Sequence, residues 1–201
     1  MVTRENRNTL AEVLIGALTA VAFEEMVRAV HESVAHNGFA VKTLALPVIF
    51  ALTTIRFLMG NLLHLIKDPP RNAQATDQTN DGLAWFGDLM VIVVLATVLA
   101  FLGGLTAGEE SVKLNFSFFD VLCVVYVIDA LWIILALWIR GREVPWGWLI
   151  LDVAMLLATL VIYGCLGRAA AYSEIGLAVF VFANAAAFGF DVWLQRKYGL
   201  I

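Results

Sequence analysis

The segment that decides the fold is TTIRFLMGNLLHLIK, residues 53–67, inside an apolar run that extends over residues 43–66. Its polar members share one side of a helix at 100° per residue: Thr53, Arg56, Gly60, Asn61, His64 and Lys67. If the run crosses a bilayer, Arg56 lies near its middle, where a charge needs a carboxylate partner or a wet cavity. The segment therefore predicts a membrane protein with a polar interior.

The composition of the chain is typical of a membrane protein. Of its 201 residues, 61% are hydrophobic and 15% are charged, and the mean hydropathy is +0.85, whereas roughly half of an ordinary soluble domain is apolar. A membrane-spanning helix needs about 20 apolar residues. Six stretches have this length, at residues 10–31, 44–66, 84–106, 117–139, 146–166 and 173–194. We therefore predict an all-α integral membrane protein with a single transmembrane domain over residues 1–201.

The distribution of Lys and Arg predicts the orientation in the membrane. In a six-span arrangement, one side carries Arg4, Arg7, Lys67, Arg71, Arg140, Arg142, Arg196 and Lys197. The other side carries only Lys42, Lys113 and Arg168. The positive-inside rule assigns the richer side to the cytoplasm, so we expect both termini there, together with a mobile loop at residues 68–82. The short links between spans favour the inner (plasma) membrane of a prokaryote.

The spans also carry a weak internal similarity. Residues 12–23 of the first span resemble residues 152–163 of the fifth, and each even-numbered span has a polar residue late in its course: Asn61, Asp129 and Asp191. One interpretation is three helical hairpins derived from one unit, because repeats are common in transporter folds. The alternative is chance similarity between apolar segments of simple composition.

Polar residues within the spans define a candidate transport pathway. At a rise of about 1.5 Å per residue, they come out near the membrane midplane or in its cytoplasmic half: Arg56, Asn61, His64, Asp129, Asp152, Asn184 and Asp191. Acids outnumber bases in this set, so the cavity would attract cations or protons. We expect Arg56 to act as the internal counter-ion and His64 to relay protons. The alternative is structural, with Arg56 paired to Asp129 or Asp191 to hold helices together.

A second polar cluster ends the first span, in the sequence EEMVRAVHESVAH over residues 24–36. Glu25, Glu32 and His36 share a stripe at helical spacing and could hold a divalent metal, the only cofactor that we consider. Alternatively, the cluster is a solvated helix end stabilised by a pair between Glu24 and Arg28. The HESVAH segment is not the zinc-protease motif, because its histidines are five residues apart instead of four.

These observations favour movement of a small cation or proton through an acidic cavity open to the cytoplasm. An intramembrane enzyme that acts on a lipid or isoprenoid substrate through the Glu24–His36 cluster is the first alternative. A non-catalytic membrane subunit or effector is the second. We expect the lipid bilayer and further copies of the chain as partners, since Gly104 and Gly108 favour close helix packing. The scattered Lys and Arg residues exclude a nucleic-acid patch.

Overall fold

The computed structural model describes residues 4–67, 78–107, 116–140 and 146–199, and some side chains near helix ends, including those of His36 and His64, lie outside this description. All the regular elements in these ranges are helical, as predicted. The longer helices are α1 (Arg4–Asn37), α2 (Val41–Lys67), α3 (Gln78–Gly104), α4 (Phe118–Arg140), α5 (Trp146–Thr159) and α7 (Glu174–Lys197). The short elements are the 3-10 turn η1 (Leu105–Ala107), the π-helical turn η2 (Leu160–Cys165) and α6 (Arg168–Ala171).

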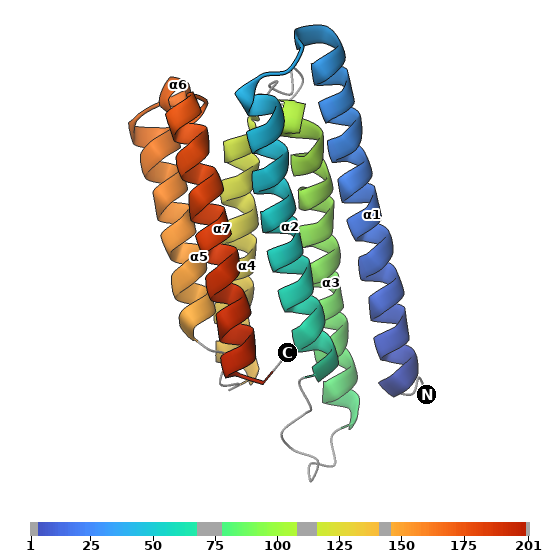
Figure 1. The fold of residues 1–201 in the computed structure, drawn as a ribbon. Helices are drawn as coiled ribbons and strands as arrows, with labels where there is room; N and C mark the ends of the chain where they lie inside the picture. The colour runs from blue at the N-terminus through green and yellow to red at the C-terminus, as the bar shows by residue number, and fades with distance from the viewer. Residues whose placement is uncertain (1–3, 68–77, 108–115, 141–145, 200–201) are drawn as a thin grey trace.

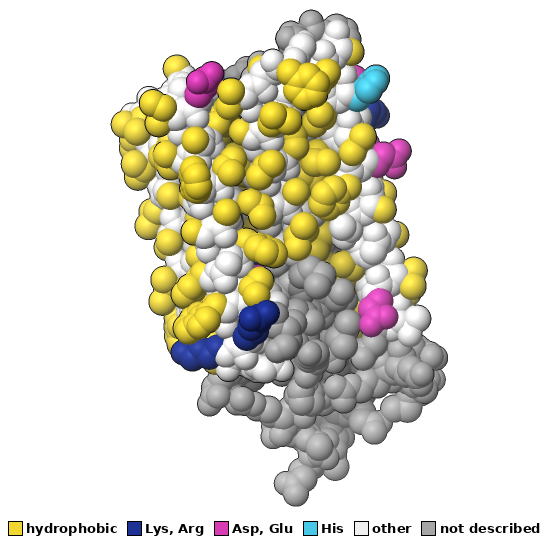
Figure 2. Space-filling view, in the orientation of Figure 1, with side chains coloured by type: hydrophobic (Ala, Val, Ile, Leu, Met, Phe, Trp, Pro, Cys, Tyr) yellow, Lys and Arg dark blue, Asp and Glu magenta, His cyan; other side chains and the backbone are white. Residues whose placement is uncertain are grey.

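Four helical segments of the described chain are long and apolar enough to cross a membrane: Trp85–Gly104, Phe118–Ala136, Trp146–Cys165 and Glu174–Lys197. The apolar part of α2 is shorter, at Thr43–Leu58. Hydrophobic side chains cover most of the described surface in Figure 2, and the charged ones lie toward its edges and ends. This surface suits contact with lipid, and the four segments support the prediction of a transmembrane-helix protein.

The long helices run up and down in one bundle (Figure 1). Helix α1 packs against α3 and α2, whereas α4 and α7 both pack against α5. Contacts between α2 and α7, and between α3 and α4, join these two groups. Helix α1 begins and α7 ends at the same end of the bundle (Figure 1). Helix α3 begins at Gln78, within the loop predicted at residues 68–82, and residues 68–77 lie outside the described chain.

Local side-chain contacts explain where two of these helices begin. At the start of α4, the Ser117 backbone N–H donates to Asp120 Oδ2 at 2.9 Å, and the Asp120 N–H points back to Ser117 Oγ at 3.4 Å. This reciprocal arrangement is a capping box, which satisfies N–H groups that have no partner within the helix. At the start of α7, Ser173 Oγ accepts the Gly176 N–H at 3.1 Å. Polar residues thus mark both helix starts.

Close packing joins α1 to α3. A Cβ atom added at Gly103 would lie 2.6 Å from the carbonyl oxygen of Ala22, so glycine permits this approach of the two helices. Nearby, the rings of Phe23 and Phe50 meet edge to face with centroids 5.4 Å apart. These contacts are apolar, and small residues at a helix interface are typical of membrane proteins.

The turn η2 widens the end of α5. The Leu166 N–H donates to the Val161 carbonyl oxygen at 3.1 Å, five positions earlier instead of the four of an α-helix. The sequence gives no sign of this turn, because residues 160–165 (LVIYGC) have no proline and read as a continuous apolar helix.

Candidate functional site: a polar column between four helices

Buried polar side chains lie between α2, α4, α5 and α7 in several hydrogen-bonded groups, and we call this set the polar column. Helix α2 contributes Thr53, Arg56 and Asn61; α4 contributes Tyr126 and Asp129; α5 contributes Trp148 and Asp152; α7 contributes Asn184, Asp191 and Gln195. Asn61 is half-buried and the others are at most 9% exposed. No member comes from α1 or α3.

Asn184 organises the end of the column that lies in the middle of the bundle. Thr53 Oγ1 and the Tyr126 hydroxyl both donate to Asn184 Oδ1, at 3.0 and 3.1 Å. The amide nitrogen of Asn184 donates in turn to the Phe180 carbonyl oxygen at 2.9 Å. Three helices therefore meet at one amide group, and the orientation of that group follows from its hydrogen bonds.

The centre of the column contains a buried ion pair. Arg56 Nη2 donates to Asp152 Oδ1, and the two side chains are only 5% and 3% exposed. The guanidinium also lies over the rings of Phe57 and Tyr126, with Cζ 4.4 and 5.5 Å from their centroids. Arg56 Nη1, however, has no hydrogen-bond partner. A buried donor without a partner is costly, so a rearrangement or a bound polar species that satisfied this atom would be favoured.

A second carboxyl group adjoins this ion pair. Asp129 Oδ1 accepts a hydrogen bond from Asn61 Nδ2 at 3.3 Å, and the Asp129 carboxyl is close enough to the Asp152 carboxyl to interact with it. The Asn61 amide also donates to the Phe57 carbonyl oxygen at 2.8 Å. Two acids from different helices therefore lie near each other, and one of them, Asp152, is paired with the guanidinium of Arg56.

Asp191 organises the other end of the column. The Trp148 indole N–H donates to Asp191 Oδ1, and the Gln195 amide donates to Asp191 Oδ2 at 3.0 Å. The Gln195 amide lies beside Gly60, where an added Cβ would be 3.9 Å away. From Asn184 to Gln195, α7 advances about 16 Å at 1.5 Å per residue. The column therefore covers roughly half of a hydrocarbon core about 30 Å thick.

An aromatic layer lies beyond Asn184, and we define it as Phe118, Phe119 and Phe180. All three side chains are at most 2% exposed. The centroids of Phe119 and Phe180 are 4.4 Å apart, and those of Phe118 and Phe119 are 5.5 Å apart. Tyr172 packs on Phe119 at 5.0 Å, and burial raises the pKa of its hydroxyl, which keeps it neutral. The layer is a group of buried apolar rings beyond the Asn184 end of the column.

A smaller polar group lies on the far side of this layer. Asp120 Oδ2 accepts hydrogen bonds from the Ser117 hydroxyl at 2.7 Å and from the Tyr163 hydroxyl at 3.0 Å. Arg168 approaches the same oxygen at 3.9 Å, and its side chain is 51% exposed. This group therefore has its own partners and reaches the surface, separate from the polar column.

Most residues of the predicted pathway lie in the column: Arg56, Asn61, Asp129, Asp152, Asn184 and Asp191. The side chain of His64 lies outside the described residues. Arg56 makes its ion pair with Asp152, whereas the structural alternative named Asp129 or Asp191 as its partner. The rotation of each helix about its own axis decides which acid faces Arg56. The position of a residue along its helix gives its depth in the membrane but not this rotation.

Sequence reasoning missed Trp148 and Gln195 as members of the column. Trp148 belongs to a tryptophan pair with Trp146, which is exposed, so the pair suggested an aromatic belt at the membrane interface. Gln195 lies four residues after Asp191 and therefore on the same helix face, which is the one signal that could have identified it.

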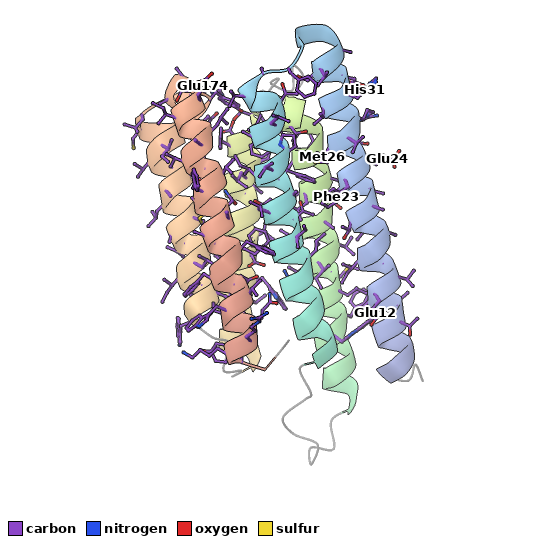
Figure 3. The ribbon with its side chains drawn as sticks, viewed as in Figure 1. Glu12, Phe23, Glu24, Met26, His31 and Glu174 are labelled. Carbon is purple, nitrogen blue, oxygen red and sulfur yellow. The ribbon has the colours of Figure 1, made fainter. Side chains whose placement is uncertain are left out.

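The cluster on α1 differs in detail from the sequence prediction. Arg28 pairs with Glu25, three residues earlier, and not with Glu24. Glu24 and His31 point away from the bundle, whereas Phe23 and Met26 point toward the neighbouring helices (Figure 3). Among the side chains that the structure describes, no three His, Cys, Asp or Glu residues are arranged to hold a metal ion. The predicted site at Glu25, Glu32 and His36 includes a side chain outside that description and stays a prediction.

Comparison of the chain with protein-family models, curated proteins and solved structures finds no match. The polar column is therefore interpreted from its own geometry and charge.

Proposed function

We propose that the protein moves a small cation or a proton across a membrane through the polar column. In this proposal α1 and α2 are also membrane spans, which gives six, and both termini are cytoplasmic. The observation that carries the proposal is the charge balance of the column. Among the side chains that the structure describes, the column holds three buried carboxyl groups, on Asp129, Asp152 and Asp191, and one guanidinium, on Arg56.

The free energy that is needed to bury these charged side chains in a membrane supports a functional role for them. Insertion scales assign about 2.5–3.5 kcal/mol to each Asp or Arg at the centre of a membrane helix. A structural ion pair between helices needs one acid for one base, and the pair of Arg56 with Asp152 already provides it. Asp129 and Asp191 add two acids that this pair does not require. Surplus carboxylates in a membrane interior are typical of ion and proton pathways.

The position of the column supports access from one side. Its Asp191 end lies toward the termini of the bundle, where α1 begins and α7 ends (Figure 1). This is the side that the positive-inside rule assigns to the cytoplasm, and Arg196 and Lys197 close α7 there. At the opposite end the aromatic layer separates the column from Asp120. In this proposal the ion enters from the cytoplasm, and the aromatic layer must open to let it pass.

The two alternatives have less support. For an enzyme that acts on a lipid or isoprenoid, Glu24 and His31 would have to face a shared site, but both point away from the bundle (Figure 3). A non-catalytic subunit would explain the ion pair of Arg56 with Asp152, but it gives no reason for the second acid beside it. We further propose a homo-oligomer in a prokaryotic inner membrane, as expected from the sequence.

The test is a measurement of charge movement that does not depend on which ion moves. Liposomes containing the purified full chain are adsorbed on a solid-supported membrane, and current is recorded after a combined step in pH and monovalent cation concentration. We expect current from the wild type, loss of current in Asp129→Asn and in Asp191→Asn, and normal current in Glu12→Gln. Glu12 is a matched control because it is an exposed acid on α1, outside the column.

Size-exclusion chromatography establishes that each variant assembles as the wild type does. Absence of current from well-assembled wild-type protein would refute transport. If, in addition, the Asp129 and Asp191 variants fail to assemble, the subunit interpretation would replace it.

A further inference from the structure

We infer that the ion carried is a proton, that it is held on the carboxyl pair Asp129–Asp152, and that Arg56 changes partner when it binds. This inference rests on the proposed transport function and names its substrate. It follows from three features of the column: the neighbouring carboxyl groups, the guanidinium on one of them, and the unpartnered Arg56 Nη1.

The guanidinium argues against a metal cation at this site. A cation bound to Asp152 would lie within a few ångströms of Arg56, which donates to the same carboxyl group. Like charges at this distance repel strongly in a medium of low dielectric constant. A proton avoids this repulsion, because it joins the carboxylate covalently and leaves a neutral acid beside the guanidinium.

The number of available ligands leads to the same conclusion. A metal cation requires a shell of several oxygen ligands to replace its water. Among the described side chains, no group of three or more His, Cys, Asp or Glu residues is arranged to hold a metal ion. Both carboxyl oxygens of Asp191 already accept hydrogen bonds, one from Trp148 and the other from Gln195. A proton needs only one carboxylate oxygen, which the pair provides.

Arg56 provides the response to proton binding. In the structure its Nη2 is bonded to Asp152 and its Nη1 is buried without a partner. A proton that moves from a hydronium ion onto Asp152 leaves a water molecule and a neutral carboxylic acid. The acid holds the guanidinium less strongly, so Arg56 turns toward the neighbouring carboxyl group of Asp129, and Nη1 gains a partner. Loss of the proton back to water reverses the change.

The groups that face Asp152 all come from packed helices of the column. They are Arg56 from α2, Tyr126 and Asp129 from α4, and Asp191 from α7. Two nearby carboxyl groups that share one site favour retention of a proton between them. The pair is therefore suited to take up and release a single proton.

The experiment compares proton flux with metal-cation flux in the same proteoliposomes. Proton uptake is followed with a pH-sensitive dye inside liposomes that hold the full chain, with valinomycin and potassium to balance charge. Entry of radioactive sodium and rubidium is measured in parallel preparations without valinomycin, because valinomycin itself carries rubidium. We expect proton uptake with no sodium or rubidium entry above protein-free liposomes. We expect Asp129→Asn to lose proton uptake, and Glu12→Gln to keep it.

An infrared measurement keeps the inference testable if the variants fail to assemble. The carboxylic-acid band of wild-type protein, identified by its shift in heavy water, should grow as the pH is lowered, and it should be smaller in any assembled Asp129→Asn sample. Sodium or rubidium entry without proton uptake would overturn this inference and leave transport intact. Unchanged proton uptake in assembled Asp129→Asn would overturn it as well. Absence of every flux would instead refute the proposed function itself.

Discussion

Replacing Arg56 by glutamine should destabilise the protein more than replacing its partner Asp152 by asparagine. Arg56 is the one base among the described members of the polar column, and its side chain is 5% exposed. Without it, the three buried carboxyl groups lose the one base of the column that the structure describes. Breaking a buried ion pair by removal of one partner costs about 3–5 kcal/mol, so we expect a loss in this range for Arg56→Gln.

The cost of Asp152→Asn should be smaller, because Arg56 keeps acidic neighbours in Asp129 and Asp191. The asparagine carbonyl oxygen also still accepts from Arg56 Nη2. The change then replaces a charge-assisted hydrogen bond by a neutral one, which costs about 1–2 kcal/mol. The two changes should also interact. In the Arg56→Gln background, Asp152→Asn removes one of the uncompensated acids and should therefore stabilise the protein.

The assay is reversible unfolding in mixed micelles at increasing SDS mole fraction, followed by tryptophan fluorescence for both single variants and the double variant. Arg28→Gln is the matched control, since its pair with Glu25 is exposed, with 65% of the Arg28 side chain accessible. Such surface pairs contribute about 0–1 kcal/mol. Further destabilisation of Arg56→Gln by Asp152→Asn would refute the idea that Arg56 compensates the acids of the column.

Three further outcomes are expected. Gly103→Leu should cost roughly 1–3 kcal/mol of unfolding free energy through overpacking against the Ala22 carbonyl. Gly16→Ala has nothing within 4 Å of the added Cβ and should not lower the unfolding midpoint, because alanine favours a helix more than glycine does. Ser117→Ala should lose about 1 kcal/mol with the cap of α4, measured by the same unfolding curve, and an unchanged midpoint would contradict the capping role. Phe119→Ala should open the aromatic layer and increase current on the solid-supported membrane, and a current no greater than that of the wild type would contradict its role as a barrier.

The helices of this protein follow closely from its sequence. The stretches predicted at residues 117–139 and 173–194 correspond to α4 at Phe118–Arg140 and α7 at Glu174–Lys197. Apolar runs of span length leave little choice of structure, because backbone groups in hydrocarbon must bond within their own helix. The polar face of α2 was also predictable, since Arg56 and Asn61 follow helical periodicity and both reach the column.

The partners within the column were less predictable. Arg56 could meet an acid from any neighbouring helix at a similar depth, and the choice of Asp152 depends on the rotation of α5 and on which helices are neighbours. Hydrophobic periodicity gives little information on rotation in helices that are apolar on nearly every face, as α4 and α5 are. The role of Trp148 was hidden for another reason, because an indole N–H suits a membrane interface as well as a buried acceptor.

The π-helical turn η2 is a place where the chain can lose one residue without disturbing the polar column. A π-helical turn holds one residue more than an α-helical turn of similar rise. Loss of one residue within Leu160–Cys165 would return the turn to α-helix and leave Trp148 and Asp152 in place. Loss of one residue between these two would rotate one against the other by about 100° and separate their contacts. During evolution, this span should therefore accept the insertion or deletion of one residue within η2, but not within α5.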